Sequence, residues 1–133
     1  MQPCDPTAEK ASPAIQADDR LKPRTKALGL RVIRLVDALP KTTAAQVVGR
    51  QVLRSALSVG ANYRAACRAR SRAEFISRMG IVEEESDETH YWLEILADSG
   101  LIDATRLAAM LHETSELTAM VVASIRTARK GAK

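Results

Sequence analysis

Apolar residues recur every three or four positions in four segments of the chain, at about residues 24–39, 43–68, 71–98 and 103–128. This spacing places them along one face of an α-helix, because 3.6 residues make one turn. The most regular stripe belongs to the third segment and consists of Phe75, Met79, Val82, Ser86, Thr89, Leu93 and Leu96. Its alternating steps of four and three are typical of helices that pack as in a coiled coil. The pattern therefore predicts four amphipathic helices.

Residues with strong preferences for helix ends separate these segments. Pro40 ends the first helix, because a proline disfavours the helical conformation of the residue before it. Thr43 and Ser71 are each followed three residues later by a Gln or Glu, which is the capping-box pattern of a helix start. Gly100 fits the end of the third helix, and Asp103 fits the N-cap of the fourth.

The connectors between the predicted helices are short, so sequential helices are expected to run antiparallel. The predicted fold is all-α, an up-down-up-down antiparallel four-helix bundle formed by residues 23–128. Residues 1–22 contain three prolines and no apolar periodicity, which predicts a flexible N-terminal tail. Residues 129–133 are predicted to be a short basic C-terminal tail.

Composition narrows the class of protein. Only four of the 133 residues are aromatic, so the core must consist mainly of aliphatic side chains and alanine, which suits closely packed helices.

The sequence has no apolar run of about 18 residues and no signal-peptide core at its start. Its two cysteines, Cys4 and Cys67, are too few for a disulfide framework. We therefore expect reduced thiols and a cytoplasmic location.

The net charge of +4 is mild, but the charges are separated along the chain. Residues 20–42 and residues 43–80 each carry a net charge of +6. Residues 81–103 carry a net charge of −8 and contain no Lys or Arg. Opposite blocks of this size indicate ionic pairing, either within a chain or between chains.

The densest basic cluster lies between the second and third predicted helices. It contains Arg64, Arg68, Arg70 and Arg72. One interpretation is a nucleic-acid-binding patch, because guanidinium groups near a helix N-terminus suit phosphates. The other is structural: a solvated turn, or arginines that pair with residues 83–88 of a neighbouring subunit. Tyr63 is the only aromatic residue in this stretch, which argues against recognition of single strands by stacking. Because basic clusters are weakly specific, both interpretations stay open.

Candidate catalytic and metal-binding groups are few. Asp87 and His90 have the spacing of one half of a di-iron motif, but the second half is absent. His112 has no carboxylate three residues before it, and no motif accompanies Cys67 as a nucleophile. We therefore expect no metal, no cofactor, no small-molecule substrate and no enzymatic activity.

Tyr91 and Trp92 are adjacent on the third predicted helix, so their side chains point about 100° apart. At least one of the two rings should therefore lie outside the core of its own chain. Exposed aromatic rings are enriched in subunit interfaces. We treat Tyr91 and Trp92, together with Glu84 and Glu88, as a candidate oligomer interface.

Two stretches of the chain carry a distinctive order of residues. The first is Gln51-x-x-Arg54-Ser55-Ala56-x-Ser58-Val59-x-x-Asn62, followed by Arg68, Ser71, Glu74 and Phe75. The second consists of residues 91–96 and 99–102. In this order and spacing they resemble the four-helix bundle proteins encoded by the 23S ribosomal RNA intervening sequence, over about residues 28–125. The chain departs from that family at Ala65, where the family usually has a Glu.

This resemblance implies an up-down bundle that associates into a ring-like homopentamer. Within the motif, Asn62, Ser71, Glu74 and Phe75 are expected to be structural. The chain is also similar to the accessory variability determinants of diversity-generating retroelements, which are basic pentamers of this fold that bind nucleic acid and a reverse transcriptase. We therefore expect a non-catalytic homo-oligomeric scaffold with RNA or DNA as candidate partner and no membrane association. The alternative is a purely structural bundle without a nucleic-acid partner, in which the arginines pair with acidic residues of a neighbouring subunit.

Overall fold

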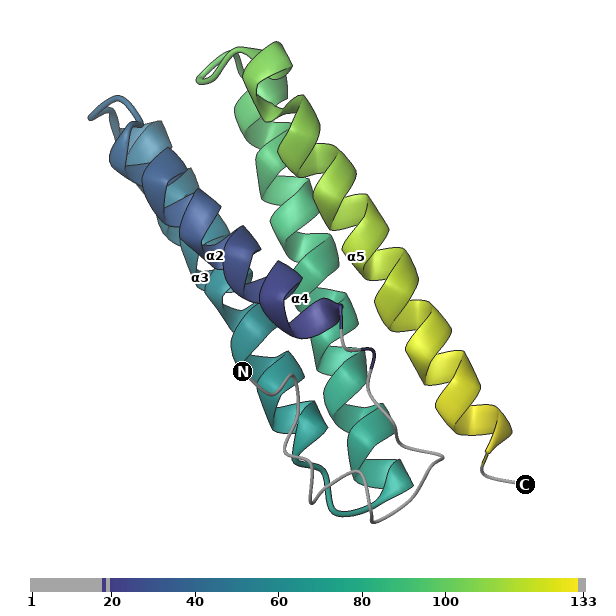
Figure 1. Ribbon diagram of the computed structural model, residues 1–133. Helices are drawn as coiled ribbons and strands as arrows, with labels where there is room; N and C mark the ends of the chain where they lie inside the picture. The colour runs from purple at the N-terminus through teal and green to yellow at the C-terminus, as the bar shows by residue number, and fades with distance from the viewer. Residues whose placement is uncertain (1–17, 19, 132–133) are drawn as a thin grey trace.

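The computed structural model describes residue 18 and residues 20–131, and these residues form a four-helix bundle (Figure 1). Its helices are α2 (Leu21–Asp37), α3 (Thr43–Cys67), α4 (Arg72–Asp98) and α5 (Ala104–Lys130). Sequential helices run antiparallel, and no strand occurs among the described residues. The prediction of an all-α, up-down-up-down bundle is confirmed.

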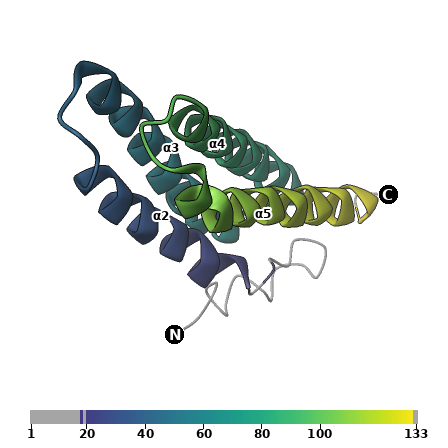
Figure 2. The same ribbon diagram turned by 90° about the horizontal axis from the view of Figure 1, so that it is seen from above.

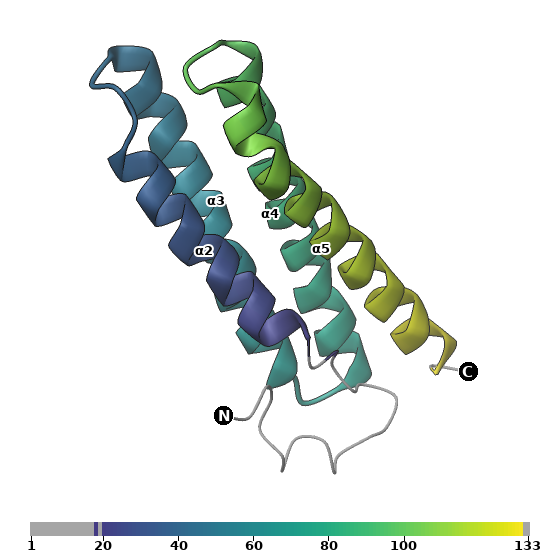
Figure 3. The same ribbon diagram turned by 45° about the horizontal axis from the view of Figure 1, so that its top comes forward.

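The four helices occupy the corners of the bundle, with α2 and α4 on one diagonal and α3 and α5 on the other (Figure 2). α3 packs along both α2 and α4, and α4 packs along α5. Contact between α2 and α5 is much less extensive, and the two helices diverge toward the end of α2 and the start of α5 (Figure 3).

The ends of the helices differ from the predicted ends by a few residues. α2 begins at Leu21, earlier than the predicted start at about residue 24, because Pro23 is tolerated in a first turn where its missing N–H has no helical acceptor. The same helix ends at Asp37, two residues before the predicted end at Leu39, which directly precedes Pro40. α5 continues to Lys130, so residues 129 and 130 of the predicted tail are helical. Most of the predicted N-terminal tail lies outside the described residues.

Side chains cap the starts of three helices. Ser71 accepts a hydrogen bond from the backbone N–H of Glu74 at 3.1 Å, as predicted. Asp103 also caps its helix, accepting from the N–H of Thr105 at 3.0 Å. At the start of α3 the N-cap is Thr42 rather than the predicted Thr43, because Thr42 has the extended backbone that a cap requires.

The buried stripe of α4 is the predicted one, from Phe75 to Leu96. On α3, one large side chain is buried and another is exposed. Tyr63 is fully buried, and its hydroxyl donates to the backbone oxygen of Asp18 at 2.8 Å. Leu57 is 45% exposed because it lies at the outer edge of the contact between α2 and α3.

Buried hydroxyl groups connect α4 to both of its neighbours. Thr89 donates to Ser55 of α3 at 2.9 Å. On the other side, the hydroxyl groups of Ser86 and Thr118 of α5 lie 2.7 Å apart. These polar contacts are specific to one alignment of the helices, so they favour the observed register over a shifted one.

The structure bears on the expected redox state of the cysteines but not on the expected cytoplasmic location. Cys67 is disulfide-bonded, so the expectation of a reduced thiol is wrong for this residue, whereas Cys4 lies outside the described residues. None of the described helices is long and apolar enough to cross a membrane. The cytoplasmic location stays a prediction.

Candidate nucleic-acid interface

The predicted motif residues build the junction between α3 and α4. Ser71 caps α4, and the carboxylate of Glu74 accepts from the backbone N–H of Arg70 at 3.2 Å. This completes a variant of the capping box, because the standard form bonds to the N–H of the cap residue itself. Phe75 anchors the first turn of α4 in the core, and the amide of Asn62 donates to the backbone oxygen of Ser58 at 2.9 Å. The junction is therefore held by its own hydrogen bonds.

The four candidate arginines of this junction differ in availability. Arg64 and Arg68 are exposed, and neither forms an ion pair with any described residue. Arg70 is exposed as well, with its Nε 3.6 Å from the Glu74 carboxylate. Arg72 is half-buried, and its Nε is buried without a hydrogen-bond partner among the described residues. Of the four, Arg64 and Arg68 are thus the two that are exposed and have no ion pair among the described residues.

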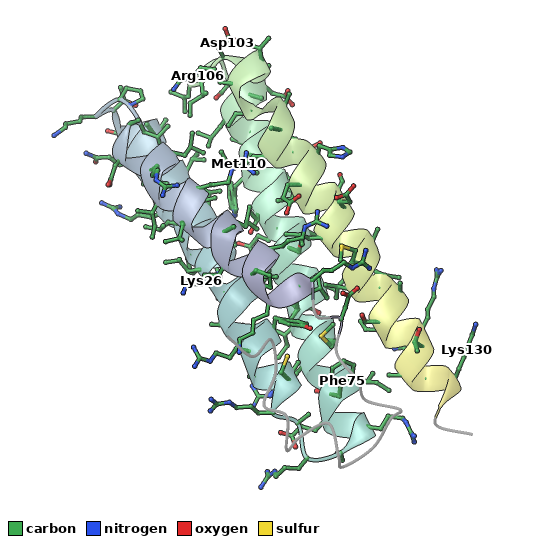
Figure 4. All side chains as sticks on the ribbon, viewed as in Figure 1. Lys26, Phe75, Asp103, Arg106, Met110 and Lys130 are labelled. Carbon is green, nitrogen blue, oxygen red and sulfur yellow. The ribbon has the colours of Figure 1, made fainter. Side chains whose placement is uncertain are left out.

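The antiparallel topology adds more cations to the same end of the bundle, because α5 ends beside the start of α4 (Figures 1 and 4). We call the end formed by residues 61–80 and 119–131 the basic end. Its cationic side chains are Arg64, Arg68, Arg70, Arg72, Arg78, Arg126, Arg129 and Lys130. The only carboxylate in these two segments is that of Glu74.

The cluster predicted from the sequence did not include the cations of α5. They lie about fifty residues from the junction along the chain, and residues 129–133 were predicted to be a tail. The predicted topology was sufficient to place them there, because an up-down-up-down bundle brings the end of its fourth helix beside the start of its third.

The acidic residues of α4 are partly neutralised within the chain. Arg54 of α3 forms ion pairs with both Glu85 and Glu88 of α4. The indole N–H of Trp92 donates to Glu88 at 3.0 Å. This hydrogen bond, followed by that from Arg54, lowers the pKa of Glu88. Two carboxylates that were candidates for contacts between subunits therefore have partners in their own chain.

The remaining residues of the candidate interface lie on the outer side of α4. Tyr91 is 51% exposed, which confirms that one of the two adjacent rings lies outside the core. Its ring contacts that of Trp92 edge to face, with the centroids 5.0 Å apart, and Trp92 packs against the core. Glu84 is exposed. Whether these residues meet a second subunit stays a prediction.

A second intrachain cluster joins α2 to α5. Arg24 donates to both carboxylate oxygens of Glu113, from Nε at 3.0 Å and from a terminal nitrogen at 2.7 Å. It also forms an ion pair with Glu116. These hydrogen bonds raise the pKa of Arg24 and lower that of Glu116. The cluster holds the start of α2 against α5, the region where these two helices meet.

The residues considered for metal binding or catalysis do not come together. His90 Nδ1 lies 2.7 Å from the hydroxyl of Thr114, and its Nε2 lies 3.6 Å from Glu94. His112 is exposed on α5, with its Nε2 3.4 Å from Glu116. Within the described part of the chain, no group of three or more His, Cys, Asp or Glu side chains could hold a metal ion.

Comparison with known proteins identifies a family and similar solved structures. The sequence profile of the family described as 23S rRNA-intervening sequence protein matches residues 20–123. A crystal structure of a protein of unknown function from the S23 ribosomal protein family of Bacteroides thetaiotaomicron superposes with a TM-score of 0.74 at 31% sequence identity. That match covers 79% of this chain and 97% of the other. No curated protein matches the chain significantly.

Proposed function

The chain belongs to the 23S rRNA-intervening sequence protein family, and on that premise we propose that it is a non-catalytic homo-oligomeric scaffold that binds the phosphate backbone of RNA or DNA at its basic end. Neither the family description nor that of the Bacteroides protein names an enzymatic activity. A ring of five copies is part of the proposal and rests on the family resemblance. Light scattering tests it, with an expected mass of five times 14.5 kDa.

The concentration of charge at the basic end carries the proposal. The two segments that define the basic end carry eight cationic side chains and a single carboxylate, that of Glu74. Arg64 and Arg68 have no ion-pair partner among the described residues, so binding a polyanion would not require breaking an existing pair. Positive surfaces of this kind bind nucleic acid by releasing the counterions condensed on the phosphates.

The aromatic residues favour recognition of the backbone over recognition of bases. Tyr63 and Phe75, the aromatic residues of the basic end, are buried in the core. Tyr91 lies about 28 Å along α4 from Arg72, at a rise of about 1.5 Å per residue. Unstacked bases of single strands are usually held by exposed aromatic rings. A double-stranded ligand bound without sequence specificity therefore fits this surface best.

The alternative function, a structural bundle whose junction arginines pair with a neighbour's α4, has weaker support. Glu85 and Glu88 are two of the carboxylates available for such pairs, and both contact Arg54 within the chain. The two functions differ in what reversal of Arg64 and Arg68 does. In the first, this reversal weakens nucleic-acid binding; in the second, it breaks the oligomer.

Fluorescence anisotropy with a labelled RNA duplex of about 20 base pairs tests the proposal at low salt. The double reversal Arg64→Glu with Arg68→Glu should weaken binding at least about tenfold. A matched control, Lys41→Glu with Arg106→Glu, changes the net charge equally at the opposite end of the bundle and should bind like the wild type. Milder changes, Arg64→Gln with Arg68→Gln, guard against a folding defect. Equal binding by wild type and reversed protein would contradict the proposal.

A further inference from the structure

The outward face of α2 carries an exposed leucine between two cations. Leu30 is 45% exposed and lies on the side of α2 opposite the buried Leu28 and Val32. Lys26 precedes Leu30 by four residues and Arg34 follows it by four, so all three lie on one helical face. Both cations are exposed, and neither forms an ion pair with a described residue. Figure 4 labels Lys26 on this helix.

More apolar surface extends this face toward α3. Ile33, three residues after Leu30, is 38% exposed. The Cδ2 atom of Leu57 lies 3.1 Å from the position that a Cβ atom on Gly29 would occupy, so Leu57 lies against α2 at Gly29, four residues before Ile33. The result is an exposed apolar centre with a positive rim, which we call the basic-apolar surface: Lys26, Leu30, Ile33, Arg34 and Leu57.

The outward face of α4 has the same layout with opposite charge. Tyr91 is preceded by Asp87 four residues earlier and followed by Glu94 three residues later, and all three are exposed. Asp87 has no ion pair among the described residues, and Glu94 approaches only His90, at 3.6 Å. Trp92 supports the Tyr91 ring through their edge contact. We call Asp87, Tyr91 and Glu94 the acidic-aromatic surface.

The two surfaces face away from each other within one molecule. α2 and α4 lie at diagonal corners of the bundle, and each surface is on the side of its helix opposite the core (Figure 2). They therefore cannot meet within one chain, but two copies can bring the basic-apolar surface of one against the acidic-aromatic surface of the next. Each copy would keep one surface of each kind available for further association.

We propose that copies of this chain associate head to tail through these two surfaces, with the Tyr91 ring packed on the apolar centre around Leu30 and the two charged rims paired. An aromatic anchor surrounded by paired charges is the usual anatomy of a specific protein interface. Contacts between two different patches generate a closed ring when the rotation between copies closes, and a filament when it does not. The inference rests on the homo-oligomeric part of the proposed function and names the surfaces that form the oligomer.

Charge exchange tests this arrangement with the full chain. One variant carries Lys26→Glu with Arg34→Glu, a second carries Asp87→Lys with Glu94→Lys, and a third carries all four substitutions. Each double variant should shift the mass measured by light scattering from the oligomer to 14.5 kDa. The fourfold variant should regain the wild-type mass, because its two rims are complementary again. Circular dichroism checks that all variants are helical, and Lys41→Glu with Arg106→Glu serves as the charge-matched control for the first variant.

The outcomes separate this inference from the proposed function. If the wild type is oligomeric and both double variants keep its mass, the two surfaces are not the interface, although the oligomer itself stands. If the double variants are monomeric and the fourfold variant does not reassemble, the rims do not pair with each other. A monomeric wild type at up to about 100 µM would overturn both the inference and the proposed oligomer, and would leave the two surfaces to other protein partners.

Discussion

Thr89 of α4 donates its hydroxyl hydrogen to Ser55 of α3 across 2.9 Å, and both side chains are fully excluded from solvent. Each hydroxyl also has a backbone oxygen within its own helix, that of Glu85 at 2.8 Å for Thr89 and that of Val52 at 3.2 Å for Ser55. Because an unpaired buried hydroxyl is destabilising, these second partners limit the effect of losing either side chain. The pair therefore acts mainly on how α3 and α4 align.

Replacing either member of this pair should have a modest effect on stability. Thr89→Val and Ser55→Ala should each lower the free energy of unfolding by about 1 kcal/mol, the usual net contribution of a hydrogen bond. The loss of unfolding free energy in the double variant should exceed the larger single loss by no more than about 0.3 kcal/mol, because both changes remove the same interaction. Urea denaturation measures all three. Fully additive losses would show that the two hydroxyls do not interact.

Gly80 offers a stabilising substitution. It lies inside α4, and a Cβ atom at this position would meet nothing within 4 Å. Glycine within a helix is less favourable than alanine by about 0.5–1 kcal/mol. Gly80→Ala should therefore raise the free energy of unfolding by that amount in urea denaturation. A loss of stability would mean that the surface around Gly80 is occupied, for example by another subunit.

Gly49 is the matched comparison on α3. A Cβ atom there would lie 3.0 Å from Cδ1 of Leu39 and 3.4 Å from Cγ1 of Val36. The leucine would have to move, so the gain in helix propensity is opposed by crowding. Gly49→Ala should be less stabilising than Gly80→Ala when the two are measured side by side. A larger gain at Gly49 would contradict the close approach of α2 and α3.

Acid should weaken the contact between α3 and α4 through Glu88. The hydrogen bond from Trp92 and the ion pair with Arg54 lower the pKa of Glu88 below the 4.5 of an unperturbed Glu. A lowered folded-state pKa means that the unfolded chain takes up the proton first. The contribution of Glu88 to stability is therefore present above about pH 4.5 and is lost as the pH falls through the folded-state pKa.

The variant Glu88→Gln isolates this effect. Its stability should fall less steeply than that of the wild type between about pH 5 and pH 3 in urea denaturation followed by circular dichroism. Glu84→Gln, an exposed residue of the same helix without an ion pair among the described residues, should retain the wild-type slope. Equal slopes for wild type and Glu88→Gln would show that Glu88 is not preferentially ionised in the folded state.

The fold was predictable because each helix carries its own period and end signals. The buried stripe of α4 follows from its spacing, and Ser71 and Asp103 cap as their residue types indicate. Choosing Thr43 instead of Thr42 was an error of one position, because two adjacent threonines offer the same side chain and only the backbone conformation distinguishes them.

The candidate site was predictable only in part, because its remaining features depend on how the helices align. The intrachain pairs of Arg54 with Glu85 and Glu88 require the register of α3 against α4, which the helical period does not determine. The opposition of the surfaces around Leu30 and Tyr91 requires knowing that α2 and α4 are diagonal. The cations at the end of α5 required only the topology, yet their distance along the chain concealed them.

The dependence of duplex RNA binding on salt tests the central claim most directly. The logarithm of the association constant of the wild type should fall linearly with the logarithm of salt concentration between about 50 and 200 mM. The slope should become shallower by about one for each phosphate that a variant no longer neutralises, so Arg64→Gln with Arg68→Gln should reduce it by up to about two. Binding that does not weaken with salt, or an unchanged slope in the double variant, would contradict a phosphate-binding function for the basic end.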